Sequence, residues 1–242
     1  MKVAFISDIH ANFPALCRAL ESAKRCGAQK IVCAGDVVGF GPHPTEVVRL
    51  LIEEKVACIQ GNMDRKVLAA PQSPKKLQKR LKGGPAKASQ AWAALNLGEA
   101  EKAWLAGRPG DLRLTLGGVD VWVVHGSPVS DRDYVFPSIT NRALLAKLRQ
   151  ERPSVLVCGH SHIPFTRRVS GVRVVNCGSV GRPVDGDPRG SYALCEFAGG
   201  RARCRIVRFS YPVHTLLMDL IARKAPSVRS EDYVRGIKPK EE

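Results

Sequence analysis

The chain has 242 residues, of which 44% are hydrophobic, and this is enough for one large core or two small ones. No apolar run approaches the length needed to cross a membrane, and the chain opens directly into a strand-like segment, so we expect neither a membrane protein nor a signal peptide. Lys and Arg number 38 against 22 Asp and Glu, a formal net charge of +16 that favours anionic partners such as phosphorylated small molecules, nucleic acid or an acidic surface.

The eight cysteines indicate a reducing compartment rather than a disulfide framework. No C-x-x-C pair occurs, and five cysteines fall inside or beside strand-like runs, where free thiols behave as small buried hydrophobic groups. We therefore expect free thiols and a cytoplasmic protein. The five are Cys33, Cys58, Cys158, Cys177 and Cys204.

The first quarter of the chain alternates strands with amphipathic helices. Helical patterns begin at Asn12 and around Val47, and a polar side chain follows each strand. This alternation predicts an α/β sheet whose chemistry lies at the carboxyl ends of its strands. The predicted strands are residues 3–7, 31–34 and 56–60.

Residues 65–98 interrupt the alternation with a basic segment that contains eight Lys or Arg and no Asp or Glu. Residues 75–82 predict one short basic helix, and the surroundings of Trp92 and Trp104 predict further helices that pack over the sheet. The basic segment is either a solvated surface or an anion-binding lid.

From residue 111 the chain becomes rich in strands. We find no linker that would separate two domains, so we expect one domain over residues 1–224 and a loosely held basic tail over residues 225–242. Arg201, Arg203 and Arg205 alternate with apolar residues and give the last strand a cationic face. The predicted strands are 112–116, 119–124, 154–158, 165–169, 172–176, 192–197 and 201–209, and the helices are 141–150 and 213–224.

Seven residues with metal-binding side chains follow strand-like runs. Asp8 and His10 are two residues apart, so their side chains project the same way past the end of their strand. A carboxylate and an imidazole aimed at one point suit a divalent transition metal. A single polar residue after a strand is usually a turn former, but seven in one scaffold argue against coincidence. The set is Asp8, His10, Asp36, Asn62, His125, His160 and His162.

The ordered motifs D-x-H, G-D, G-N-x-D, H-G-S-P and G-H-S-H resemble those of the calcineurin-like metallophosphoesterases. The resemblance runs from Met1 to about Tyr211 and is closest to the small bacterial and archaeal phosphoesterases of the phosphodiesterase type. Their G-D-x-V-G-x-G-P loop and G-S-V-G-x-P segment correspond here to residues 35–42 and 178–183. The resemblance implies an α/β fold of two mixed β-sheets packed as a sandwich with flanking helices, and a metal-dependent phosphoesterase.

Carried over position by position, the resemblance implies two divalent metal ions. Asp8, His10 and His162 would hold one ion; Asn62, His125 and His160 would hold the other, with Asp36 bridging both. These ligands are compatible with Mn²⁺, which we expect first, and with Fe, Zn²⁺ or Ni²⁺. Two ions at ~3.5–4 Å would lower the pKa of a shared water, and the bridging hydroxide would attack phosphorus in line.

One position departs from the family pattern. Many relatives have a His after the Asn, a candidate to protonate the leaving group, and this chain has Met63 there. A thioether cannot donate a proton, and Asp64 lacks its usual imidazole partner. We therefore expect activated or diester substrates, and a phosphodiesterase in preference to a monoesterase. The expected catalytic residues are Asp36, Asn62, Asp64 and His125.

Arg182 and Arg189 lie in a loop that should pass near the site. Their guanidinium groups either bind substrate phosphate or pair with Asp185 and Asp187. His43, in a proline-rich loop, is interpreted as a surface residue rather than a ligand.

Two alternatives accompany a phosphodiesterase that acts on a phosphorylated small molecule or nucleotide. The net charge and the basic segment also suit a nucleic-acid phosphohydrolase, although Trp92 is the one aromatic platform in that segment. A catalytically weak scaffold that binds phosphate or nucleic acid is disfavoured, because all seven ligand types are kept. The sequence leaves the oligomeric state open.

Overall fold

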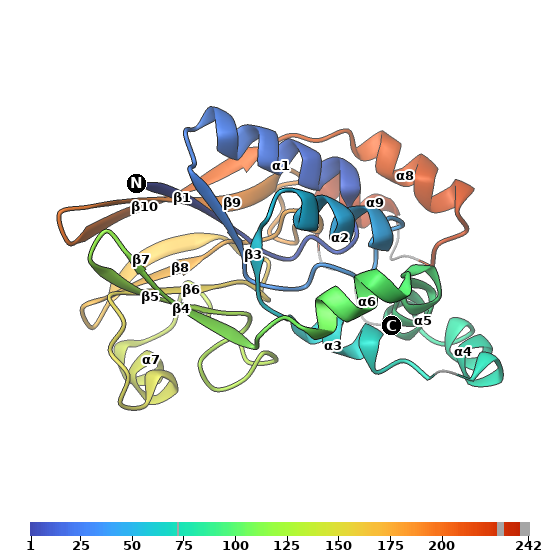
Figure 1. Cartoon of the computed structure of the whole chain (residues 1–242), viewed down its shortest axis with the longest axis horizontal. Coiled ribbons are helices and arrows are strands. Elements are labelled where there is room, and N and C mark those ends of the chain that lie inside the picture. Colours follow the sequence, from blue (N-terminus) through green and yellow to red (C-terminus); the bar gives the residue numbers. More distant parts are fainter. Residues whose placement is uncertain (72, 227–229, 238–242) are drawn as a thin grey trace.

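The computed structural model describes residues 1–71, 73–226 and 230–237. Two mixed five-stranded sheets pack face to face with helices outside them, as the sequence predicted (Figure 1). The first sheet has the order β10-β9-β1-β2-β3 and the second the order β4-β5-β6-β8-β7. The first comprises β1 (Lys2–Ile6), β2 (Lys30–Cys33), β3 (Ala57–Cys58), β9 (Gly190–Ala198) and β10 (Arg201–Phe209), and the second β4 (Asp111–Leu116), β5 (Val119–Val124), β6 (Val155–Cys158), β7 (Phe165–Val169) and β8 (Val172–Asn176).

Three neighbouring strands of each sheet are parallel. In the first sheet β1 pairs with β2 and β2 with β3, all parallel; in the second β5 pairs with β6 and β6 with β8, also parallel. In the first sheet the antiparallel strands β9 and β10 lie on one side of them and β3 forms the other edge, whereas in the second sheet the antiparallel strands β4 and β7 lie on both sides. Because parallel strands end at the same edge of a sheet, the residues that follow β1, β2, β3, β5 and β6 meet at one end of the sandwich.

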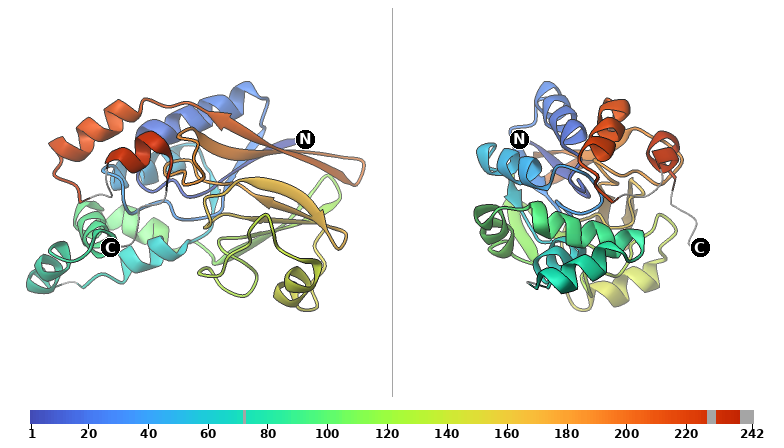
Figure 2. Two further views of the ribbon diagram at one scale, coloured as in Figure 1. Left: turned by 180° about the vertical axis from the view of Figure 1, so that it is seen from behind. Right: turned by 90° about the vertical axis from the view of Figure 1, so that its right-hand side faces the viewer.

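The helices cover the outer faces of the two sheets. In opposite views α1 and α8 lie over the first sheet, and α7 lies against the second (Figure 1, Figure 2). Among the described residues no helix is long and apolar enough to cross a membrane. The helices are α1 (Phe13–Arg25), α2 (Pro44–Glu53), α3 (Asn62–Leu68), α4 (Pro74–Leu81), α5 (Pro85–Asn96), α6 (Glu99–Ala106), α7 (Asn141–Leu148), α8 (Val213–Ala222) and α9 (Ser230–Arg235).

The core forms where β-branched side chains of the two sheets interdigitate. Val3, Phe5 and Val32 of the first sheet pack against Val123 and Val157 of the second, and all five are buried. A second cluster lies between the first sheet and helices α1, α2 and α8, and a third lies under α7. These three apolar clusters hold the strands in place and so position the loops that follow them.

Helix α1 begins where its sequence signals predicted. The side chain of Asn12 accepts a hydrogen bond from the backbone N–H of Ala15 at 3.1 Å, as an N-terminal cap does. Its amide also donates to the carbonyl oxygen of Gly181 at 2.8 Å. Asn12 therefore ties the loop after β1 to the later loop that carries Arg182.

The helices predicted around Trp92 and Trp104 are α5 and α6. Helices α5 and α6 contact α2 and α3, and Ala93 of α5 and Leu105 of α6 belong to the apolar cluster that covers the first sheet. Helix α3, which begins at Asn62, was not predicted, because strand β3 ends at Cys58 and the chain turns directly into the helix. The basic segment is thus joined to the end of a strand through α3.

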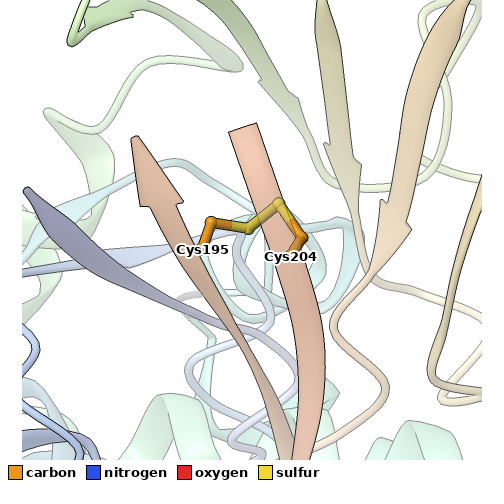
Figure 3. Close-up of a disulfide and its surroundings, with 2 residues drawn as sticks. All are labelled: Cys195 and Cys204. Carbon is orange, nitrogen blue, oxygen red and sulfur yellow. A yellow bond between two sulfur atoms is a disulfide. The ribbon is translucent and has the colours of Figure 1, made fainter. Parts of the chain in front are cut away.

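The expectation that every cysteine is a free thiol is wrong for two of them. Cys195 and Cys204 form a disulfide between neighbouring strands β9 and β10 (Figure 3). The two residues are direct partners in the antiparallel register, which brings their Cα atoms to 4.1 Å. The expectation of free, buried thiols holds for Cys33, Cys58, Cys158 and Cys177.

The expectation of a loosely held tail is wrong for its described part. Residues 230–235 form α9, and its Tyr233 and Asp232 are buried. Ile237 forms a β-bridge with Asp185. The polar composition of this segment hid the helix, because Asp232 and Tyr233 are its only buried side chains among the described residues. Residues 227–229 and 238–242 of the predicted tail lie outside the described residues.

Candidate metal centre

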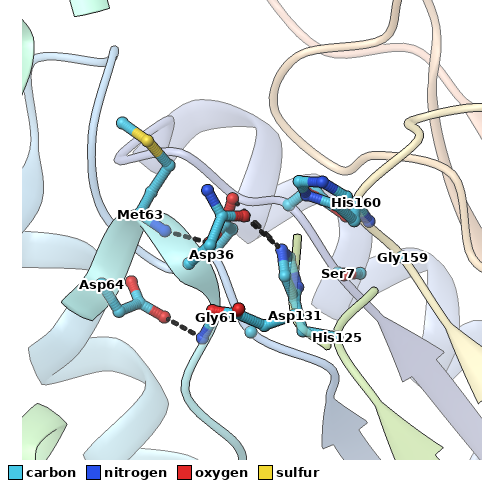
Figure 4. A network of polar contacts seen from close by, with 12 residues as sticks. Ser7, Asp36, Gly61, Met63, Asp64, His125, Asp131, Gly159 and His160 are labelled. Carbon is cyan, nitrogen blue, oxygen red and sulfur yellow. Dashed lines mark hydrogen bonds and ion pairs between the residues drawn. The ribbon is translucent and has the colours of Figure 1, made fainter. Parts of the chain in front are cut away.

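The structure brings the seven predicted ligand residues to one end of the sandwich. Six of them form two groups in which the ligand atoms lie within 4.8 Å of one another, Asp8 with His10 and His162, and Asp36 with His125 and His160. Asn62 lies beside the second group. We call these seven residues the candidate metal centre, and Figure 4 shows the second group with its neighbours.

The first group is buried and closely spaced. Nε2 of His162 lies 3.1 Å from Oδ1 of Asp8 and 3.1 Å from Nε2 of His10. Asp8 and His10 are almost fully buried, at 0% and 1% exposure. Three ligand atoms therefore face a common point that water hardly reaches.

The second group is assembled around His125. Its Nε2 atom lies 3.0 Å from Oδ1 of Asn62 and 3.3 Å from Oδ2 of Asp36. Oδ2 of Asp36 is also 3.8 Å from Nε2 of His10 in the first group. This carboxylate oxygen lies between the two groups, the position that a bridging ligand needs.

Backbone strain is concentrated in these loops. Five candidate ligands have positive φ angles of 51–63°, a conformation that costs non-glycine residues of order 1–3 kcal/mol each. Backbone hydrogen bonds to the next loop hold them there, from Asp8 to the carbonyl of Gly35 and from His10 to that of Asp36. A strained backbone conformation persists only where surrounding contacts hold it in place, and such conformations are concentrated at functional sites. The five are Asp8, His10, Asp36, His160 and His162.

Two glycines let the loops approach the carboxylates. A Cβ atom on Gly61 would lie 2.1 Å from Oδ1 of Asp36, and one on Gly159 would lie 2.4 Å from Oδ2 of Asp8. No other residue fits at these two positions without displacing a candidate ligand.

The hydrogen bonds of two imidazoles direct their Nε2 atoms into the centre. Nδ1 of His125 lies 2.8 Å from the carbonyl oxygen of Ala34, and Nδ1 of His162 lies 2.5 Å from that of Arg182. A carbonyl can only accept, so Nδ1 carries the proton in both rings, and Nε2 is left to face the other ligands. Metal-ligating histidines are oriented in this way.

The donor set and its unpaired atoms fit divalent metal ions. Oδ1 of Asp8 and Nδ1 of His10 are buried without a hydrogen-bond partner among the described residues. Burial would raise the pKa of Asp8, but the neighbouring His162, His10 and His125 outweigh it and hold that pKa well below its usual range. Two ionised carboxylates and four imidazoles, divided between two neighbouring groups, are ligands that such ions prefer.

His125 carries positive charge in the metal-free centre. Burial lowers its pKa, but the carboxylates of Asp36 and Asp8 and the carbonyl of Ala34 outweigh burial and raise the pKa to about 10. Burial lowers the pKa of His160 and of His10. In the metal-free centre His125 is therefore an imidazolium, and a bound cation would take the place of its proton.

Asp64 lies beside the centre with both carboxylate oxygens in use. Oδ2 accepts from the backbone N–H of Gly61 at 2.9 Å and Oδ1 from that of Val38 at 3.0 Å. Burial, and then the charge of Asp36, raise its pKa to about 7. Asp64 thus joins the loop after β2 to the start of α3.

Met63 turns its side chain away from the centre (Figure 4). Its backbone N–H donates to Oδ1 of Asp36 at 2.7 Å, while its sulfur accepts a weak hydrogen bond from Nε2 of Gln90 at 3.8 Å. Gln90 belongs to α5, so the helices of the basic segment pack against this side of the centre.

The two predicted substrate-binding arginines differ in their surroundings. Arg189 forms a bidentate ion pair with Asp187, which was the alternative interpretation. Arg182 lies over the ring of Phe40 at 4.2 Å, and its Nε atom is buried without a hydrogen-bond partner among the described residues. Phe40 in turn packs edge-on against His10. Arg182 therefore stays close to the candidate metal centre, and Arg189 is committed elsewhere.

The interpretation of His43 as a surface residue is wrong. His43 is 3% exposed, and its Nε2 lies 3.0 Å from Oδ2 of Asp219 on α8. The partner lies 176 residues away in the sequence, so the proline-rich surroundings of His43 gave no indication of burial.

Sequence reasoning missed two aromatic residues at the centre. Phe40 contacts His10, and the exposed ring of Tyr134 stacks on His160 with a centroid distance of 4.4 Å. Phe40 stands inside the G-D-x-V-G-x-G-P loop, so its place in the motif was a usable signal. Tyr134 lies in the loop after His125, and no motif marks it.

A cavity of about 270 Å³ opens beside His125. Polar groups dominate its wall, among them the Arg65–Asp131 ion pair and Ser127. The hydroxyl of Ser127 donates a hydrogen bond to Asp133 and accepts one from the backbone N–H of Val129.

Comparison with known proteins agrees with the motifs. Residues 1–200 match the family model of the calcineurin-like phosphoesterase superfamily domain. An uncharacterised protein of Methanocaldococcus jannaschii, MJ0912, is 28% identical over 97% of this chain and 98% of its own. A solved metallophosphoesterase from Sphaerobacter thermophilus is 26% identical, with a TM-score of 0.81 over 98% of this chain and 99% of its own.

A third relative is similar over a shorter stretch. Phosphodiesterase YfcE of Escherichia coli is 40% identical over 77 residues, which is 28% of this chain and 42% of YfcE. This chain thus matches less than half the length of that relative in sequence. The solved YfcE structure, described as a phosphoesterase, aligns over 81% of this chain and 88% of its own, with 25% identity and a TM-score of 0.50.

Proposed function

Since the chain belongs to the calcineurin-like phosphoesterase superfamily and is a metal-dependent phosphoesterase, we propose that it hydrolyses phosphate diesters with two divalent ions. The observation that carries the proposal is the pair of facing ligand groups, with Oδ2 of Asp36 within 3.8 Å of a histidine nitrogen in each. Asp8, His10 and His162 would hold one ion and Asn62, His125 and His160 the other. Asp36 would contact both, and Mn²⁺ is the first metal to test.

The bound ions would supply positive charge to the phosphate oxygens and lower the pKa of a water between them. The chain itself provides orientation. The carbonyls of Ala34 and Arg182 fix two imidazole rings, and Asp64 fixes the loop that carries Asp36. Arg182, with an unpaired buried Nε, lies where its guanidinium could bind a non-reacting phosphate oxygen.

The preference for diesters rests on what surrounds Asn62. The next residue, Met63, has no proton to give, and its side chain points at Gln90 and away from the centre. Asp64 has both oxygens occupied by backbone N–H groups. Neither residue can protonate a poor leaving group, so activated leaving groups are favoured.

We propose that residues 1–224 form the catalytic domain.

The test compares bis-p-nitrophenyl phosphate with p-nitrophenyl phosphate, using metal-free protein before and after addition of Mn²⁺. We expect hydrolysis to require the metal and the diester to react faster. Asp36→Asn should lose the activity, whereas Asp120→Asn, the same change at an exposed position on β5, should keep it. Absence of hydrolysis with any divalent ion, despite two ions bound, would overturn the proposal.

A nucleic-acid substrate is a second candidate, and α4 is the observation that favours it. Lys75, Lys76 and Lys79 are exposed on this helix and form no ion pair among the described residues. The helix is held by Leu77 and Leu81, which pack on Ala91 of α5. Because α5 contacts α3, whose first residue is Asn62, this cationic surface is connected to the candidate metal centre.

The binding of a single-stranded oligonucleotide tests the second candidate. Lys75→Gln, Lys76→Gln and Lys79→Gln together should weaken binding and lower the salt slope by about two. The matched control is Arg201→Gln, Arg203→Gln and Arg205→Gln, which removes equal charge from β10. Equal weakening by both triple variants would mean that net charge alone binds the nucleic acid, and the candidate would be dropped.

A further inference from the structure

The four histidines of the candidate metal centre are oriented in two different ways. His125 and His162 each donate through Nδ1 to a backbone carbonyl. Among the described residues, no hydrogen bond is made by the ring of His160, and Nδ1 of His10 has no partner. Each ligand group therefore contains one imidazole fixed by a carbonyl and one that is not.

An aromatic ring contacts each of the two remaining imidazoles. Phe40 meets His10 edge-on, with centroids 5.1 Å apart and planes at 78°. Tyr134 lies nearly parallel to His160, with centroids 4.4 Å apart and planes at 25°. Stacked rings at this separation attract one another and restrict rotation about χ2, the torsion that turns the imidazole.

Packing in an apolar core does not explain the position of Tyr134. Its side chain is 43% exposed, so it is not part of a core, and its second ring contact is with the equally exposed Phe136. The backbone beneath it is firmly held, because the next residue, Val135, is fully buried in the cluster under α7. The fold thus presents a tyrosine ring from a fixed point onto His160.

We propose that Tyr134 is a positioning residue that keeps the His160 imidazole in the orientation in which it binds a metal ion. Stacking takes the place of the carbonyl that serves His125 in the same group. The inference rests on the proposed function, since it requires His160 to be a metal ligand. Loss of groups that orient metal-ligating histidines typically weakens metal binding by about 10–100-fold.

The experiment measures Mn²⁺ binding to metal-free, full-length protein by calorimetric titration. Tyr134→Leu removes the ring but keeps an apolar side chain, and Tyr134→Phe keeps the ring. Phe136→Leu removes the outer ring of the same loop and leaves the Tyr134–His160 pair in place. Thermal unfolding of each metal-free variant separates a binding defect from a folding defect.

We expect the wild type to bind two ions, and Tyr134→Leu to bind one of them about tenfold more weakly. Tyr134→Phe and Phe136→Leu should remain within about twofold of the wild type, and the metal-free melting temperatures should agree. Wild-type affinity for both ions in Tyr134→Leu would overturn the inference alone. Equal weakening in Tyr134→Phe would also overturn it, and a wild type that binds no ion pair would overturn the proposed function as well.

Discussion

Nδ1 of His125 lies 2.8 Å from the carbonyl oxygen of Ala34, the residue just beyond β2. This bond joins the two sheets at the candidate metal centre, since His125 follows β5 of the second sheet. It also fixes the ring so that Nε2 faces Asp36 and Asn62. The chemistry of the centre therefore depends on how one imidazole is held between two loops.

Metal uptake should release protons. The pKa of His125 in the metal-free protein is about 10, because the effect of burial is outweighed by Asp36, Asp8 and the Ala34 carbonyl. At pH 8 the imidazolium must lose its Nε2 proton before that atom can bind a cation, so about one proton should be released from His125. Calorimetry in buffers of different ionisation enthalpy measures the number. His125→Asn should release about one proton fewer, and an unchanged number would contradict this assignment.

Asp64→Asn should lower both stability and hydrolysis, because it disturbs the loops that Asp64 joins. The amide keeps one acceptor oxygen, so the backbone N–H of either Gly61 or Val38 loses its partner and faces an N–H₂ group. We expect the free energy of unfolding to fall by about 1–3 kcal/mol and hydrolysis to fall about tenfold or more. Urea denaturation and steady-state kinetics measure the two effects. An unaffected kcat with lowered stability would show that Asp64 supports the fold alone.

Met63→His should broaden the range of leaving groups. An imidazole at this position could supply the proton that a thioether lacks, and general acid catalysis contributes roughly 10²–10⁴-fold where it operates. We expect the rate for an alkyl phosphate ester to rise relative to that for bis-p-nitrophenyl phosphate. Met63→Leu is the matched control, since it fills the space beside Gln90 without a proton donor. If both variants gave the same ratio of rates, Met63 would not set the preference.

His43 should make the protein sensitive to acid. Burial, and then the charge of Arg223, lower its pKa below 6.5, so the folded protein binds this proton less readily than the unfolded chain. Its contribution to stability is complete above pH 6.5 and is lost as the pH falls from there toward the folded pKa, by up to about 1.4 kcal/mol for each pH unit. Urea denaturation of wild type and His43→Gln at pH 7.5 and 5.5 measures this. The variant should lose less stability, and equal losses would contradict the prediction.

The disulfide between Cys195 and Cys204 should be detectable by counting thiols. Unreduced, denatured protein should show six free thiols, whereas the sequence alone suggested eight. The bond closes a short loop, and its loss should lower the free energy of unfolding by about 2–3 kcal/mol. Cys195→Ala with Cys204→Ala should melt lower than oxidised wild type and close to reduced wild type. Eight reactive thiols would contradict the pairing.

The strand ends were predictable because local signals mark them. A short apolar run followed by a carboxylate or imidazole marks the positions of Asp8, Asp36 and His125, and parallel strands bring such positions together. The fold of two sheets followed from the motif resemblance and is confirmed. Features that are encoded by residues adjacent in the sequence could therefore be predicted.

Contacts between distant residues were not predictable. Asp64 accepts a hydrogen bond from the backbone of Val38, and buried His43 bonds Asp219. Tyr134 stacks on His160. The local sequence around each residue gives no indication of its partner. The Cys195–Cys204 pair depends on the exact register of a hairpin, which a shift of one residue would abolish. Arg182 and Arg189 looked equivalent in the sequence, and only their neighbours distinguish them.

Hydrolysis of a phosphate diester should require both ions of the candidate metal centre. The most direct test of this requirement adds Mn²⁺ stepwise to metal-free protein and follows hydrolysis of bis-p-nitrophenyl phosphate at each step. We expect activity to rise to a plateau at two ions per chain, and we expect Asp36→Asn to show no such rise. Full activity at one ion per chain, or no activity with two ions bound, would contradict it.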